Sequence, residues 1–116
     1  MQLTTIFATL TCVLGISLGQ LLFKKAALSL PASPSWYDWA SNVWLLVALA
    51  LYALTTFGWV WVLRIAPLSL AYPFMGLAFI VVPLLARLWL GEAVTLQTLA
   101  GGALILLGVA LAAKSA

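Results

Sequence analysis

Polar side chains recur at helical spacing near the end of the first apolar segment. Ser17, Gln20 and Lys24 are three and four residues apart, so a helix places a hydroxyl, an amide and an ammonium on one face. Polar groups at this depth in a membrane are costly unless they face a cavity or a partner. Two interpretations are open: a groove that binds an anion such as a phosphate, or packing by Gln20 with the lysine extended to the headgroups.

A second group of candidate residues lies in the apolar segment 68–90. Pro73 and Pro83 each remove an intrahelical hydrogen bond, so we expect this helix to be kinked or locally unwound. Broken helices form substrate sites in transporters, and Tyr72 with Pro73 is the expected ligand-contacting part. Arg87 is a second candidate phosphate contact. A static kink, with Arg87 extended to the interface, is the structural alternative.

Catalysis and metal binding are excluded by composition. The chain has no histidine, one cysteine (Cys12) and two acids (Asp38 and Glu92), so neither a metal site nor a Ser-His-Asp or Cys-His device can be assembled. We therefore predict a protein without enzyme activity, cofactor or metal. Glu92 is expected to approach the N-terminus of the last helix or to pair with Arg87. The net charge of +3 includes no basic cluster suited to nucleic acid.

The elements that position these residues are membrane helices. The chain of 116 residues is 66% hydrophobic and 6% charged, with a mean hydropathy of +1.24, which is typical of a membrane protein. A spanning helix needs about 20 apolar residues. Four runs meet this requirement and predict a single all-α, four-helix membrane domain over residues 1–116, with both termini on one side. The predicted helices cover residues 3–23, 43–63, 68–90 and 96–113.

The connections and the glycines constrain how these helices pack. Short links after the second and third helices predict antiparallel neighbours. The stretch 27–42 contains two prolines and predicts an extended or turn path. Gly15 and Gly19 form a GxxxG pair that suits either contact within the subunit or dimerisation. Gly101 and Gly108 lie on one side of the last helix and mark a candidate subunit seam.

Several short motifs resemble those of the drug/metabolite transporter superfamily. They are Gly19-Gln20 with Lys24, Ala71-Tyr72-Pro73, Leu90-Gly91-Glu92, and the glycine-containing segment 101–109. The chain is most similar to the small four-helix proteins related to the subunits that flip aminoarabinose-phosphoundecaprenol. It is less similar to the small multidrug resistance exporters, which carry a carboxylate in the middle of the first helix, where this chain has no acid.

The resemblance implies a multi-pass protein of the bacterial inner membrane and a phosphopolyprenyl lipid substrate. It also implies a dimer, either a homodimer or a heterodimer with a related four-helix subunit. An ammonium suits a lipid phosphate better than a cationic drug. One alternative is a small-solute exporter whose charge partner comes from another subunit or from Glu92. The other is a non-transporting subunit that only packs against a larger membrane enzyme. The expected substrate contacts are Ser17, Gln20, Lys24, Tyr72, Pro73 and Arg87.

Overall fold

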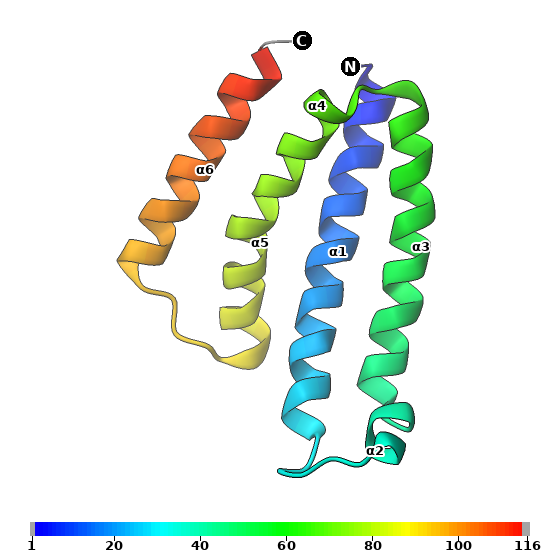
Figure 1. The fold of residues 1–116 in the computed structure, drawn as a ribbon. Coiled ribbons are helices and arrows are strands. Elements are labelled where there is room, and N and C mark those ends of the chain that lie inside the picture. Colours follow the sequence, from blue (N-terminus) through cyan, green and yellow to red (C-terminus); the bar gives the residue numbers. More distant parts are fainter. Residues whose placement is uncertain (1, 115–116) are drawn as a thin grey trace.

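The computed structural model describes residues 2–114, and the regular structure in this range is entirely helical (Figure 1). Three continuous helical segments are long and apolar enough to cross a membrane, and a shorter apolar helix, Leu96–Ala112, follows them. The predicted small helical membrane bundle is therefore confirmed. Its elements are α1 (Leu3–Ser29), α2 (Trp36–Ala40), α3 (Val43–Ile65), α4 (Leu68–Ala71), η1 (Tyr72–Leu77), α5 (Ala78–Leu85), η2 (Ala86–Leu90) and α6 (Leu96–Lys114).

Helix α1 extends further than predicted. The expected end at residue 23 is wrong, because the helix continues through both lysines to Ser29. Alanine and leucine follow the lysines and favour helix, and the first barrier is Pro31. A proline disfavours helical geometry in the residue before it, and Leu30 is extended with φ −78° and ψ 142°. Lys24 and Lys25 are therefore helical residues and not part of a loop.

Helices α1 and α3 lie side by side along most of their length (Figure 1). The GxxxG glycines make this contact possible: a Cβ on Gly15 would lie 2.8 Å from Thr55 Oγ1, and one on Gly19 would lie 3.2 Å from the Tyr52 ring. Small residues allow close backbone approach in lipid, where packing drives association. The interpretation of GxxxG as a contact within the subunit is confirmed. The buried Cys12 packs in the same interface, against Gly58.

The connection between α1 and α3 contains a short helix that the prolines did not predict. Helix α2 begins after Ser35, whose hydroxyl accepts a hydrogen bond from the Asp38 N–H, while the Asp38 carboxylate accepts one from the Ser35 N–H at 2.9 Å. This reciprocal capping box stabilises a helix start. Asn42 closes the connection, because its amide donates to the Ala26 carbonyl at 2.9 Å and its oxygen caps α3 at Leu45.

The third segment departs from α-helical geometry at two places. Pro73 lies in the first turn of the 3-10 helix η1, as expected for a residue that lacks an N–H. The π-helical turn η2 follows Pro83 and ends at Gly91, which has the left-handed φ of 69° that favours glycine. Gly91 and Glu92 both donate their N–H groups to the Ala86 carbonyl. The segment therefore departs from α-helical geometry at Pro73, whereas Pro83 lies within the α-helix α5.

Helix α6 contacts mainly η1 and α5 and lies at the edge of the bundle (Figure 1). A Cβ on Gly76 would lie 2.8 Å from Val109, so η1 and α6 approach closely near the termini. Toward the connection 91–95 the ribbons of α5 and α6 diverge, and both termini lie at the opposite end of the molecule (Figure 1). The two ends of the chain therefore lie at one end of the molecule, which is compatible with the predicted even number of spans.

Candidate functional site

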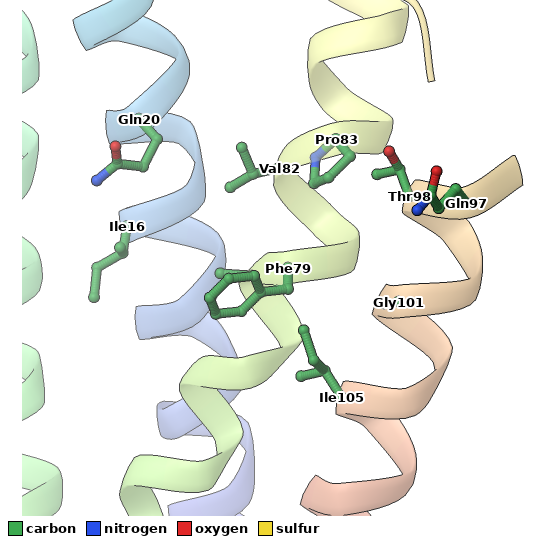
Figure 2. Close-up of a pocket in the computed structure, with 11 residues that line it drawn as sticks. Ile16, Gln20, Phe79, Val82, Pro83, Gln97, Thr98, Gly101 and Ile105 are labelled. Atoms are coloured by element: carbon green, nitrogen blue, oxygen red, sulfur yellow. The ribbon is translucent and has the colours of Figure 1, made fainter. Parts of the chain in front are cut away.

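A groove of about 570 Å³ lies between α1, α5 and α6, and we call it the α1–α5–α6 groove. Figure 2 shows Gln20 of α1 on one side, Gln97 and Thr98 of α6 on the other, and Val82 with Pro83 of α5 between them. The groove is an open surface feature and is predominantly apolar. Its lining residues are Ile16, Gln20, Ala78, Phe79, Val82, Pro83, Gln97, Thr98, Gly101, Gly102 and Ile105.

The polar groups of the groove gather at one depth. Gln20 lies one turn beyond Ile16 on α1, toward Lys24, and Gln97 and Thr98 lie in the first turn of α6. Phe79 and Ile105 line the part that is nearer to the termini (Figure 2). The groove is therefore amphiphilic along its axis. Its hydrogen-bonding side chains lie at the end near the connection 91–95, and its apolar side chains lie at the end nearer to the termini. This polarity matches a lipid with a polar headgroup.

Two local features form this groove. Thr95 accepts a hydrogen bond from the Thr98 N–H at 3.1 Å and so caps the start of α6. Gly102 faces Ile80 of α5 so closely that an added Cβ would overlap the isoleucine side chain. Close contact at Gly102 and separation at the first turn of α6 together produce a widening space. The side chain that caps the last helix is therefore that of Thr95 and not that of Glu92.

The structure separates the three polar residues that the sequence grouped on α1. Gln20 is exposed and lines the groove, and Lys24 is exposed one turn further along α1. Ser17 is fully buried, and its hydroxyl donates to the Val13 carbonyl at 2.7 Å. A hydroxyl that is satisfied within its own helix is the usual arrangement in lipid. In this conformation Ser17 is a packing residue, and Gln20 is the member of the group that reaches the groove.

The candidates of the third segment lie outside the groove. Tyr72 is exposed and Pro73 is half-buried in η1, near the end that carries the termini. Arg87 is exposed in η2, near the opposite end. The structure therefore does not bring these three residues together with Gln20, although Pro83 of the same segment does line the groove.

An ion pair stands beyond the polar end of the groove. The Lys24 Nζ lies 3.9 Å from the Glu92 carboxylate, and the two side chains are 50% and 45% exposed. The interpretation that Glu92 pairs with Arg87 is wrong, since η2 and Gly91 turn the chain so that Glu92 reaches α1. The pair joins α1 to the connection before α6.

Lys25 is held by aromatic rings. Its Nζ lies 4.7 Å from the centroid of Trp44 and 4.8 Å from that of Trp89, and the two indoles pack edge to face. An ammonium over an indole face is attracted by the ring quadrupole. Lys25 therefore links α1, α3 and η2, in addition to the headgroup contact expected of a lysine at this depth.

Two polar groove residues were missed from the sequence. Gln97 and Thr98 belong to the first turn of α6, where polar side chains are common for structural reasons. A signal was present, since Gln97, Gly101 and Ile105 recur every four residues and so share one face. Recognising it required knowing that this face meets α1 and α5.

Comparison with known proteins gives a consistent result. A Serratia proteamaculans protein named a probable 4-amino-4-deoxy-L-arabinose-phosphoundecaprenol flippase subunit, ArnE, is 38% identical over 94% of this chain and 90% of its own length. The Proteus mirabilis ArnE subunit is 33% identical over 94% of this chain and 92% of its own length. The Photorhabdus laumondii subunit ArnF is 34% identical over 86% of this chain and 89% of its own length. The chain belongs to the family of these flippase subunits. No family model and no solved structure matches.

Membership of the flippase-subunit family places the groove in a membrane protein. Three apolar helices of membrane length, together with these relatives, make the chain a multi-pass protein of the inner membrane. The large apolar side chains on the outside of α3, such as Leu54 and Phe57, are 70% and 75% exposed and suit contact with lipid. The resemblance to flippase subunits that the motifs indicated is confirmed.

Proposed function

We propose that this chain is a subunit of a flippase that moves a polyprenyl-phosphate-linked sugar between membrane leaflets. The observation that carries the proposal is the polarity of the α1–α5–α6 groove. Its hydrogen-bonding end lies beside a cationic residue at one membrane face, and its inner part is apolar. A lipid whose headgroup contains a phosphate and sugar hydroxyls has the complementary pattern. The relatives described above are named as probable flippase subunits for 4-amino-4-deoxy-L-arabinose-phosphoundecaprenol, a lipid of this kind.

The headgroup and the tail have separate positions in this proposal. The sugar hydroxyls meet the amides of Gln20 and Gln97 and the hydroxyl of Thr98, while the phosphate approaches the Lys24 ammonium. A lysine binds phosphate as a compact point charge. The polyprenyl tail stays in the bilayer and contacts Phe79 and Ile105 at the apolar end of the groove. Moving the headgroup along polar groups avoids part of the cost of carrying it through hydrocarbon.

Only part of the site predicted from the sequence belongs to this path. Gln20 and Lys24 keep the substrate-contacting roles proposed for them. Ser17 is assigned to packing because its side chain is buried and hydrogen-bonded within α1. Pro73 shapes the third segment, and Tyr72 and Arg87 take part only where the lipid enters or leaves beyond the groove.

A second four-helix subunit completes the transporter in this proposal. The groove is open on one side, and the adjoining helix α6 exposes Leu104, Leu107 and Leu111. A Cβ on Gly101 or Gly108 would meet nothing within 4 Å, so a neighbouring helix has room to approach closely there. The second subunit is either a copy of this chain or a related one, since this chain is similar to subunits of both the ArnE and the ArnF kind.

The charge distribution favours a lipid over a small cationic solute. The chain's two acids, Asp38 and Glu92, lie in α2 and in the connection 91–95 respectively, outside the membrane-spanning helices. An exporter that exchanges protons for a cation needs a carboxylate within the membrane. We therefore propose a transporter without enzyme activity and without proton coupling through its own carboxylates.

Transport measured in proteoliposomes tests the proposal. The chain, purified from its own membrane with any accompanying subunit, is reconstituted with 4-amino-4-deoxy-L-arabinose-phosphoundecaprenol, and exposed lipid is labelled by a membrane-impermeant amine reagent. Wild-type protein should make lipid of both leaflets reactive, and Gln20→Leu should slow this about tenfold, the effect of losing one hydrogen bond to a charged or buried group. Gln2→Leu, which changes a glutamine outside the groove, is the matched control. Equal rates with and without protein would refute the proposal.

A further inference from the structure

The geometry of the ion pair between Lys24 and Glu92 suits ligand binding better than stabilisation of the fold. Its 3.9 Å separation exceeds the length of a charge-assisted hydrogen bond, about 2.7–2.9 Å. Within residues 2–114, neither side chain has another hydrogen-bond partner, and both are about half exposed. Partly exposed pairs contribute little to stability, typically about 0–1 kcal/mol. Both groups are therefore able to change partners at little cost.

Of the two acidic side chains, both of which lie within the described residues 2–114, Glu92 is the one available to a ligand. The other acid, Asp38, is used in the capping box of α2, where it accepts hydrogen bonds from the N–H and the hydroxyl of Ser35. The backbone of Glu92 is fixed, because its N–H donates to the Ala86 carbonyl at 3.3 Å. A carboxylate on a fixed backbone, beside an ammonium, is a preorganised pair of opposite charges.

The pair is placed at the polar end of the α1–α5–α6 groove. Lys24 follows Gln20 by one turn of α1, a rise of about 6 Å. Glu92 begins the short connection that leads to Gln97 and Thr98 in the first turn of α6. A headgroup held by the three polar groove residues therefore has both charges within reach.

The lipid for which the relatives are named carries two opposite charges of its own. Its 4-amino group is protonated near neutral pH, and its phosphodiester is anionic, so one sugar ring separates a cation from an anion. We propose that Lys24 and Glu92 recognise this charge pair: the carboxylate accepts hydrogen bonds from the sugar ammonium, and the lysine ammonium binds the phosphate. This inference rests on the proposed function and names the group that Glu92 selects.

Lys24 and Glu92 exchange each other for the two charges of the lipid, so the site never holds an unpaired charge. In the empty protein each group neutralises the other across 3.9 Å. When the lipid enters, both protein charges gain a ligand charge, so neither remains unpaired. A lipid whose amine has been acylated offers only the phosphate and would separate the protein pair without replacing the partner of Glu92. The site therefore discriminates for the free amine.

Binding of two synthetic lipids tests the inference. The probes are 4-amino-4-deoxy-L-arabinose-phosphoundecaprenol and its N-formyl derivative, whose nitrogen is neutral, and affinities are measured by native mass spectrometry from nanodiscs. Wild-type protein should prefer the free amine. Glu92→Gln should weaken its binding about fivefold, the size expected for a partly exposed ion pair. The same substitution should not weaken the N-formyl lipid and should tighten it up to about fivefold, because its phosphate no longer separates Lys24 from a carboxylate. Lys24→Gln should weaken both lipids alike.

Controls separate the failure of this inference from failure of the proposed function. Asp38→Asn neutralises the other carboxylate and should change neither affinity. Wild-type protein that binds both lipids equally, or Glu92→Gln that weakens both equally, overturns the role of Glu92 and leaves the flippase function standing. Wild-type protein that binds neither lipid overturns both. Circular dichroism of each variant establishes that helix content is kept.

Discussion

The contact of Gly15 with Thr55 gives the most direct test of how α1 and α3 pack. A methyl group on Gly15 would lie 2.8 Å from Thr55 Oγ1 and 3.4 Å from its Cγ2. The threonine cannot move away easily, because it is β-branched and its hydroxyl donates to the Leu51 carbonyl at 2.7 Å. Overpacking of this kind costs about 1–3 kcal/mol. Replacing a helical glycine by alanine stabilises the folded state by about 0.5–1 kcal/mol through helix propensity. The difference spans about 0–2.5 kcal/mol, so Gly15→Ala should destabilise the protein by about 1 kcal/mol.

A double-mutant cycle isolates the steric part of this value. In a Thr55→Ala background both close atoms are absent, so Gly15→Ala should stabilise by about 0.5–1 kcal/mol through helix propensity alone. The propensity gain cancels between the backgrounds, which leaves a coupling of about 1–3 kcal/mol. Reversible unfolding in mixed micelles, followed by the fluorescence of the six tryptophans, measures it. Additivity within about 0.5 kcal/mol would show that Gly15 does not set the distance between these helices.

Two further substitutions test the connections at the opposite end from the termini. Asn42→Ala removes the cap of α3 at Leu45 and a hydrogen bond to the Ala26 carbonyl. The free energy of unfolding should therefore fall by about 2–3 kcal/mol in the same assay. A loss below about 0.5 kcal/mol would contradict this account. Lys25→Met keeps the apolar stem but removes the charge over Trp44 and Trp89, and should cost about 0.5–2 kcal/mol with a changed tryptophan emission maximum. An unchanged emission spectrum and stability would mean that these rings do not bind the ammonium.

The membrane helices were predictable because hydrophobic length is a local property of the sequence. The end of the first helix was not, because the long stems of Lys24 and Lys25 allow a helix to leave the hydrocarbon without ending. The barrier that stops it, Pro31, was visible, but only the structure shows that the six residues after Phe23 remain helical. The proline therefore marked the helix end, and the two lysines did not.

The site was only partly predictable because it depends on which faces meet. Gln20 was identified from the cost of an amide in lipid, and it does line the groove. Ser17 shares the spacing but is buried, since helical spacing does not say which part of a face a neighbour covers. The contact of Lys24 with Glu92 joins residues far apart in the sequence and depends on the turn at Gly91. No local pattern encodes that contact.

Helix α1 places its packing residues and its groove-lining residues on faces that alternate along the sequence. Gly15 and Gly19 face α3, while the residues that directly follow them, Ile16 and Gln20, line the groove. Successive residues on a helix are rotated by about 100°, so one step along the chain changes the surface that a side chain meets. The small residues hold α1 against α3, and this fixed position in turn orients Gln20 and Lys24. Losses of stability and of lipid binding should therefore separate between neighbouring positions, because the two properties belong to different faces of one rigid helix.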